Sequence, residues 1–297
     1  MTSDTIATLD TQFRVGDQVR VVNRAGHTII VANTMTAQLE IALQGAQLLS
    51  WQPKGQPDLL WCAPLPPAGT GKAIRGGVPI CWPWFGPHAS DPAQPQHGLV
   101  RTVDWQLSHT AVTPAGVLIA LTHDAWGCAL RLDVEASSSL QLTLTTRNVG
   151  QQPVSITEAL HTYFSVSDVG GIGIHGLDGC RFRDNTDGGA EKLQHGVCRT
   201  DKETIAVFDQ APDICEIDDP GLKRRIRIAR RGGQSTVVWH PGASVAGFKD
   251  IPASTDRQFV CVESGNVGAS TVTIAPGATH KLGVTYDLLP ICWSASG

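Results

Sequence analysis

Charge is scarce in this sequence. Asp, Glu, Lys and Arg together make up 17% of its 297 residues, and the formal net charge is -4. Proteins that bind nucleic acid or an anionic membrane usually carry a basic excess, so we expect neither as a partner. An anionic small molecule would have to be held by a local group of arginines or lysines.

Long apolar runs are missing too, and no segment is long enough to cross a bilayer as a hydrophobic helix. The first residues lack the basic start and apolar core of a secretory leader, so we expect a cytoplasmic protein. The eight cysteines are scattered and form no CxxC spacing. In a reducing compartment they are expected to be small buried residues, with a few secretory disulfides as the alternative.

Several catalytic motifs are also absent. The sequence has no HExxH and no His-x-His, so its ten histidines give no metal-site spacing. It has no Gly-x-Ser-x-Gly, the turn that exposes a serine nucleophile. Gly170–Gly173 is rich in glycine but has no helical pattern beside it, so we do not expect a nucleotide-binding loop there.

Alternation of apolar and polar residues is abundant. This period of two is typical of strands with one buried face, and it runs through residues 130–135, 140–145, 225–229 and 271–274. Turn-forming residues separate these segments, and no convincing amphipathic helix is found. We therefore predict an all-β fold, a large two-sheet sandwich forming a single domain over residues 1–297, with residues 1–25 and 288–297 peripheral.

The stretch 53–95 is dense in Pro, Gly and Trp, and we expect an ordered excursion at one end of the sandwich. Within it, Arg75 precedes two glycines, which would let the backbone approach a ligand closely. The arginine suits a phosphate or a carboxylate, and Trp82 or Trp84 could offer an apolar face to a sugar. The alternative is a tight turn with a surface arginine and core tryptophans.

Three further segments carry candidate residues. His97 and Arg101 stand four residues apart in a predicted turn, so both could reach one ligand, and Gln96 adds a donor and an acceptor. A solvated loop is the alternative for this segment.

His161 follows a strand-like run and has aromatic neighbours, a setting that can place its pKa near neutrality for acid–base catalysis. A structural core histidine is the alternative, and Glu158 is expected on a solvated strand face. Glu263 ends an apolar strand, where burial would raise its pKa and make it a base. A solvent-exposed strand end is the alternative for Glu263.

Together these segments resemble the aldose 1-epimerase superfamily, and most closely its glucose-6-phosphate 1-epimerase (hexose-6-phosphate mutarotase) branch. The resemblance spans about residues 30–287 and rests mainly on Arg75–His88, His97–Arg101, Ala159–Phe164 and Phe259–Val267. It implies a galactose mutarotase-like β-supersandwich with no metal and no organic cofactor. The implied partner is a small-molecule sugar phosphate, and we expect a monomer.

The resemblance also implies residue roles. It assigns catalysis to His161 and Glu263, and substrate binding to four further side chains. These are Arg75, Gln96, His97 and Arg101. The two arginines are the expected phosphate clamp. Ile205 stands where this branch often has a sugar-contacting Asp, which leaves the preferred sugar open.

The predicted reaction is the interconversion of the α and β anomers of a hexose 6-phosphate, with glucose 6-phosphate as the expected substrate. Glu263 is expected to act as the base and protonated His161 as the acid. The alternatives are a mutarotase for free aldohexoses and a non-catalytic carbohydrate-binding or sensing domain on the same scaffold. A glycoside hydrolase would need two facing carboxylates, and only Glu263 is a strong candidate.

Overall fold

The computed structural model describes residues 3–114 and 116–290. Strands dominate it, as the alternation predicts. The elements follow in the order α1 (Ser3–Phe13), β1 (Val19–Arg24), β2 (His27–Asn33), β3 (Ala37–Ala42), β4 (Gln47–Pro53), β5 (Ile80–Cys81), β6 (Gln106–Thr113), β7 (Gly116–Ala125), β8 (Cys128–Ala136), β9 (Ser139–Asn148), β10 (Val154–Ile156), β11 (Glu158–Leu160), β12 (Tyr163–Ser165), β13 (Gly173–His175), β14 (Arg181–Asp184), η1 (Asn185–Asp187), β15 (Ala190–Leu193), β16 (Thr204–Phe208), β17 (Ile214–Asp219), β18 (Arg224–Arg231), β19 (Ser235–His240), η2 (Gly242–Gly247), η3 (Ala253–Thr255), β20 (Phe259–Asn266), β21 (Val272–Ile274) and β22 (Thr279–Pro290).

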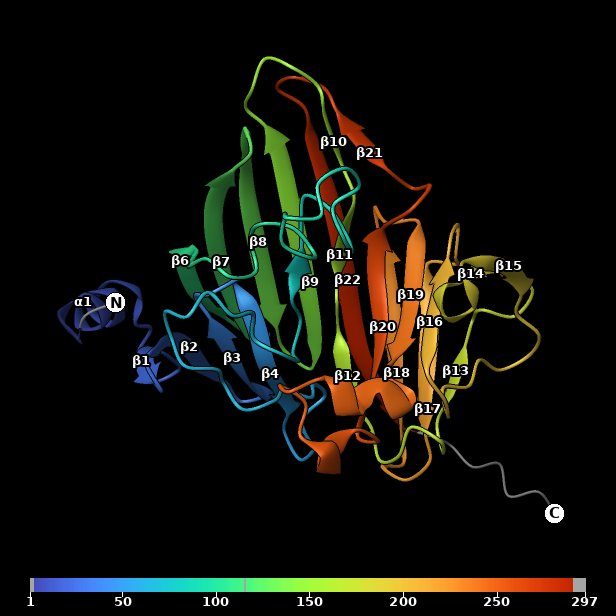
Figure 1. The fold of residues 1–297 in the computed structure, drawn as a ribbon. Helices are drawn as coiled ribbons and strands as arrows, with labels where there is room; N and C mark the ends of the chain where they lie inside the picture. Colours follow the sequence, from blue (N-terminus) through green and yellow to red (C-terminus); the bar gives the residue numbers. More distant parts are fainter. Residues whose placement is uncertain (1–2, 115, 291–297) are drawn as a thin grey trace.

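Two eight-stranded sheets form the body of the molecule (Figure 1). One has the order β15-β14-β16-β19-β20-β11-β5, with β12 also paired to β20. The other has the order β13-β17-β18-β22-β9-β8-β7-β6. A four-stranded sheet of β1 to β4 and the pair β10 and β21 complete the fold. This all-β supersandwich confirms the predicted fold class.

Strand β20 is buried along its whole length. Its Val260 and Val262 pack in the main core with Val284 of the other large sheet. Because side chains alternate along a strand, Cys261 and Glu263 point to the opposite face of β20. Burial of both faces therefore puts the Glu263 carboxyl in the protein interior.

The N-terminal helix α1 is an element that the sequence analysis did not predict. Its Ile6 is buried, and Leu9 and Phe13 pack beside it against the main core. Three large apolar side chains in eleven residues give only a narrow stripe, which explains why the helix was not predicted. The helix lies at the edge of the molecule, next to β1 (Figure 1). Among the described residues, no helix is both long and apolar enough to span a membrane.

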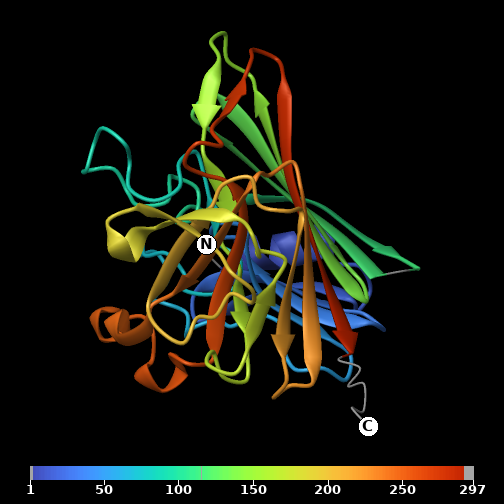
Figure 2. The same cartoon turned by 90° about the vertical axis from the view of Figure 1, so that its right-hand side faces the viewer.

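Three loop regions project from the same face of the molecule (Figure 2). They are the excursion around β5 in cyan, the β14–η1–β15 hairpin in yellow, and the segment with η2 and η3 in orange. The excursion expected over residues 53–95 is ordered, and it adds only the short strand β5 to the large sheet.

Arg230 on β18 is a cation buried to 4% exposure. Its guanidinium donates to the Thr236 hydroxyl and to backbone carbonyls of the β16–β17 connection and of the turn and strand start that follow β18. These carbonyls belong to Ala211, Pro212, Gly233 and Ser235. One side chain thus satisfies several buried acceptors and fixes where β19 begins.

Replacing Arg230 with Met should lower the free energy of unfolding by about 3–5 kcal/mol, because the buried carbonyls lose their donors. Denaturant titration followed by tryptophan fluorescence measures this. Arg231→Met is the matched control, since Arg231 is exposed on the same strand, and it should change stability by less than about 0.5 kcal/mol. Equally small losses in both variants would contradict the structural role of Arg230.

Candidate active site

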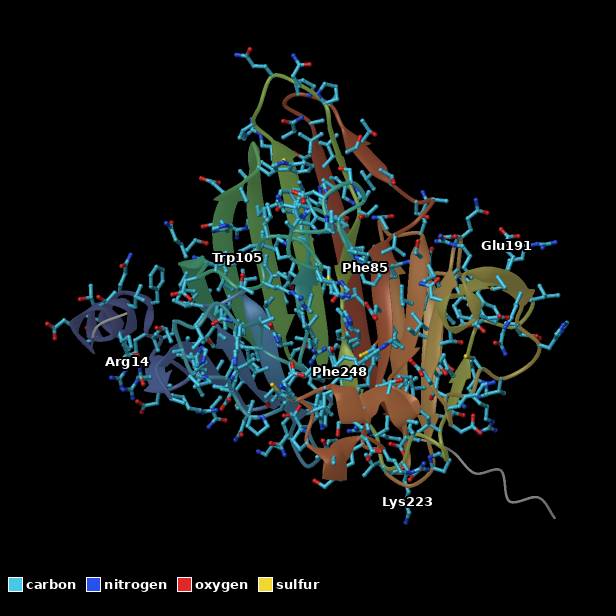
Figure 3. The ribbon with its side chains drawn as sticks, viewed as in Figure 1. Arg14, Phe85, Trp105, Glu191, Lys223 and Phe248 are labelled. Carbon is cyan, nitrogen blue, oxygen red and sulfur yellow. The ribbon has the colours of Figure 1, made fainter. Side chains whose placement is uncertain are left out.

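A cleft of about 390 Å³ opens among the three projecting loops, over the face of the large sheet that carries Glu263. The structure brings all six predicted site residues into its lining. These are Arg75, Gln96, His97, Arg101, His161 and Glu263. Much of the remaining lining is apolar, and two of its rings, Phe85 and Phe248, lie above and below the centre of Figure 3.

His161 lies in the short connection between β11 and β12. Its backbone N–H donates to the Pro79 carbonyl, and its ring stacks on Tyr163 with 4.9 Å between centroids and 9° between planes. Its Nε2 lies 3.4 Å from Oε1 of Glu263. Backbone and stacking contacts therefore hold the imidazole against the carboxyl that β20 presents.

Burial dominates the electrostatics of this pair. The His161 and Glu263 side chains are 9% and 1% exposed. Burial raises the pKa of Glu263 well above its ordinary value. Burial, together with the nearby His97 and Arg75, lowers the pKa of His161 well below its ordinary value. Both shifts favour a protonated Glu263 carboxyl and a neutral His161 imidazole, the reverse of the expected roles of Glu263 as the base and protonated His161 as the acid.

His97 is a second imidazole in the cleft, and it meets the His161 ring edge-on at 5.5 Å. Its Nδ1 accepts a hydrogen bond from the Gly86 N–H, so the neutral ring carries its hydrogen on Nε2. Burial, followed by the charges of Arg101 and Arg75, lowers the pKa of His97 to about 3. His97 is therefore a neutral hydrogen-bond donor at physiological pH.

Two arginines supply the positive charge of the cleft. Arg75 donates to the Tyr163 hydroxyl at 3.0 Å and to the Asp250 carboxylate at 2.9 Å. Arg101 donates to the backbone carbonyl of Gln96 at 2.8 Å, so Gln96 positions the guanidinium through its main chain. Both arginines also line an adjoining pocket of about 490 Å³, so they stand where the two cavities meet.

The two glycines after Arg75 serve the fold rather than a ligand, which corrects the prediction. Both have a positive φ, +101° at Gly76 and +63° at Gly77. A Cβ would lie 2.5 Å from the Trp61 carbonyl oxygen at Gly76, and 2.1 Å from the Leu48 carbonyl oxygen at Gly77. The close approach is therefore between backbone segments, and it fixes the position of Arg75.

The tryptophans predicted to face a sugar lie away from the cleft. Trp82 is fully buried in the main core, and Trp84 donates its indole N–H to the Pro95 carbonyl. Trp239 of β19 supplies the indole of the cleft and packs edge-on against Phe248 at 5.9 Å. Trp239 could not be identified from the sequence, because the residues of an apolar strand do not reveal which of its faces borders a cavity.

Strand register sets the floor of the cleft. Glu263 pairs with Val237, which pairs with Val207 on the next strand. The adjacent row consists of Cys261, Trp239 and Ile205. Paired residues project to the same face, so an apolar surface extends across the sheet from the carboxyl. Ile205 belongs to this surface, and no carboxylate replaces the sugar-contacting Asp within the two rows.

Glu158 is fully buried, which contradicts its expected place on a solvated face. Its neighbour Ala159 packs with Val237 of the cleft floor, so Glu158 points to the opposite face of the sheet. There its Oε1 lies 2.7 Å from His280 Nε2 and accepts from Asn266. Glu158 therefore does not supply the second facing carboxylate that a glycoside hydrolase would need.

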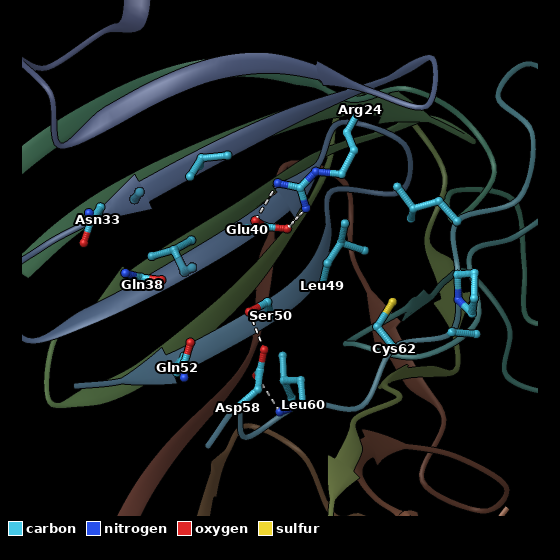
Figure 4. Close-up of a pocket in the computed structure, with 16 residues that line it drawn as sticks. Arg24, Asn33, Gln38, Glu40, Leu49, Ser50, Gln52, Asp58, Leu60 and Cys62 are labelled. Carbon is cyan, nitrogen blue, oxygen red and sulfur yellow. Dashed lines mark hydrogen bonds and ion pairs between the residues drawn. The ribbon is translucent and has the colours of Figure 1, made fainter. Parts of the chain in front are cut away.

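A larger groove of about 560 Å³ lies on the four-stranded sheet (Figure 4). Its charged groups are engaged with one another or with neighbours: Arg24 pairs with Glu40, and Asp58 accepts hydrogen bonds from Ser50 and the Leu60 N–H. No titratable group of this groove matches the six predicted site residues. The cleft over β20 is therefore the stronger candidate for the active site.

One group in the described residues has the donor atoms for a metal ion. The donors of His161, Cys261 and Glu263 all lie within 4.8 Å of one another, and all three residues are buried. This group has no signature in the sequence, because the histidine lies about a hundred positions from the other two residues.

Comparison with known proteins agrees with this geometry. The sequence profile of the family Aldose 1-epimerase matches residues 27–287. A protein of Escherichia coli K12, provisionally named glucose-6-phosphate 1-epimerase, is 32% identical over 257 residues, which cover 80% of this chain and 82% of that protein. A protein of Cenchrus ciliaris with the same provisional name is 27% identical over 282 residues, covering 88% and 84%.

Solved structures give the same answer. The crystal structure of a provisionally identified mutarotase from Salmonella typhimurium superposes with a TM-score of 0.87 at 27% identity, covering 94% of this chain and 96% of that chain. The family profile covers most of the sequence, and the matched range includes both His161 and Glu263. The chain belongs to the aldose 1-epimerase family and is an isomerase.

Proposed function

We propose that this epimerase interconverts the α and β anomers of a hexose 6-phosphate, with glucose 6-phosphate as the expected substrate. Anomer exchange needs one proton removed from the C1 hydroxyl and one given to the ring oxygen, so one acid–base pair is enough. The observation that carries the proposal is the buried pair of His161 and Glu263, 3.4 Å apart and beside two arginines in one cleft. The names of the relatives favour the phosphorylated sugar.

The proton on Glu263 sets the first step. The Glu263 carboxyl donates its proton to the ring oxygen O5, while neutral His161 accepts the proton of the C1 hydroxyl. Glu263 can instead be the base and His161 the acid. The pair then holds the same number of protons, with the carboxyl proton moved to the imidazole. Ring closure on the other face runs the transfers in reverse, and the pair returns to its starting state.

The phosphate has two effects in this scheme. Arg75 and Arg101 hold it and thereby anchor the sugar while its C1 end opens and rotates. The same two cations disfavour a proton on His161. A bound phosphate dianion offsets their charge, so it favours the state in which His161 is the acid. His97 offers a neutral Nε2–H to a sugar oxygen.

His161→Ala and Glu263→Ala should each lower kcat by about 10²–10⁴-fold, because each removes one of the two proton-transfer groups. Exchange NMR between the anomers of glucose 6-phosphate measures the rate, and circular dichroism checks the fold. His195→Ala and Glu191→Gln change the same residue types at exposed positions and should leave the rate unchanged. Near-normal exchange in either cleft variant would refute the acid–base assignment.

Arg101→Met should lower kcat/KM for glucose 6-phosphate by about 10–100-fold, the loss expected for hydrogen bonds to a charged group. Free glucose, which lacks the phosphate, should be converted at the same low rate by the variant and the parent protein. Arg181→Met, at an exposed position on β14, is the control. An equal loss on both sugars would mean that Arg101 does not read the phosphate.

The C2 hydroxyl should contribute little to recognition. With the phosphate at the arginines and C1–O5 at the pair, the C2–C3 edge of the ring extends over Val237 and Val207. We therefore expect 2-deoxyglucose 6-phosphate to have a kcat/KM within about tenfold of that of glucose 6-phosphate, whereas a site that hydrogen-bonds this hydroxyl would discriminate by ~10⁴-fold. A loss of the larger size in the same exchange assay would show that the ring lies in another orientation.

A further inference from the structure

Beside the acid–base pair lies a thiol to which the proposed reaction gives no role. Cys261 is fully buried on β20, two residues before Glu263, and its side chain points to the same face of the strand. We propose that His161, Cys261 and Glu263 form a binding site for a thiophilic divalent cation, with Zn²⁺ as the expected ion, and that this ion inhibits the enzyme.

The distances suit a small tetrahedral ion. Zinc binds nitrogen, oxygen and sulfur ligands at about 2.0–2.3 Å, which puts neighbouring ligand atoms about 3.3–3.8 Å apart. Nε2 of His161 and Oε1 of Glu263 are already 3.4 Å apart. The whole group lies within 4.8 Å, so a shift of about 1 Å by the Cys261 side chain completes the geometry.

The fold holds the three donors in place. Cys261 pairs across strands with Tyr163, the residue on which the His161 ring stacks. His161 and Glu263 line the cleft, so an ion can enter from solvent. Three protein ligands leave a fourth position facing the cleft, which a water or a sugar hydroxyl can fill.

The donor set favours zinc-like ions over Mg²⁺ or Ca²⁺, because a thiolate and an imidazole are poor ligands for hard cations. One thiolate and one carboxylate balance the two positive charges of the ion, and the displaced protons pass to solvent. The opposing charges are the guanidinium groups of Arg75 and Arg101, and Asp250 offsets the first of these.

A bound ion would occupy both groups that transfer protons, so anomer exchange would stop. This inhibition rests on the proposed function, whereas the binding of the ion does not. The two can therefore be tested with separate measurements.

The decisive variant is Cys261→Ser, and Cys81→Ser is its matched control. Cys81 is another fully buried thiol near Glu263, but it lies outside the three-residue group. Calorimetric titration of the full chain with Zn²⁺ should show one site in the parent protein and in Cys81→Ser. In Cys261→Ser the affinity of that site should fall by more than about 100-fold, beyond the loss usual for an outer-shell contact.

Cobalt gives a second readout that does not depend on activity. Co²⁺ bound in the parent protein and in Cys81→Ser should show a near-ultraviolet thiolate charge-transfer band, and Cys261→Ser should lack it. Circular dichroism checks the fold, and Cys261→Ala gives a second variant if the serine is poorly accommodated. Equal Zn²⁺ affinity in the parent protein and a folded Cys261 variant would overturn the proposal, because the ion would then be on other residues.

Activity separates the two proposals. In the metal-free parent protein, catalysed anomer exchange tests the proposed function, and its absence would sink that function while the titrations still decide the metal site. If exchange is present, Zn²⁺ should inhibit the parent protein and Cys81→Ser at concentrations about 100-fold below those needed for Cys261→Ser. Equal inhibition of all three would overturn the inhibitory role.

Discussion

The exclusion of water from the His161–Glu263 pair is the constraint on which the rest of the cleft depends. An ionised carboxylate is costly to bury without a cationic partner, and the Glu263 side chain is only 1% exposed although it borders the cleft. Burial raises the pKa of Glu263 and lowers that of His161, so both shifts favour an uncharged pair. Under the proposed function this burial has a chemical use, since a raised pKa favours a carboxyl that can donate a proton and a lowered pKa favours an imidazole that can accept one.

Charge is distributed accordingly. The chain as a whole is weakly acidic, yet the mouth of the cleft carries Arg75 and Arg101 while its floor is apolar. A ligand with one anionic end and one weakly polar end fits this change from charged to apolar lining better than a uniformly hydroxylated ligand does. Burial, followed by the charges of Arg101 and Arg75, lowers the pKa of His97 and keeps this second imidazole neutral.

Much of this was predictable, because strand alternation and a lone acidic residue at the end of an apolar run are local signals. The fold class and the residues gathered in the cleft follow from such signals, together with the family resemblance. The face of the sheet on which a given side chain lies could not be predicted from the sequence nearby, because it depends on which strands become neighbours. Glu158 lies on the face away from the cleft, Trp239 on the face toward it, and Cys261 beside His161, and register alone decides each case. The helix α1 was missed for a different reason, since its apolar stripe is too narrow to stand out.

The ion pair between Arg75 and Asp250 has a consequence for occupancy. Asp250 lies in the loop between η2 and η3, and its carboxylate pairs with the guanidinium that would hold the phosphate of the proposed substrate. An anion that binds Arg75 would have to displace the Asp250 carboxylate. Because Asp250 is part of the same chain, its effective concentration at Arg75 is high and constant. Under the proposed function, this competition would weaken the binding of substrate and product equally, which suits an enzyme whose substrate and product differ only at one carbon.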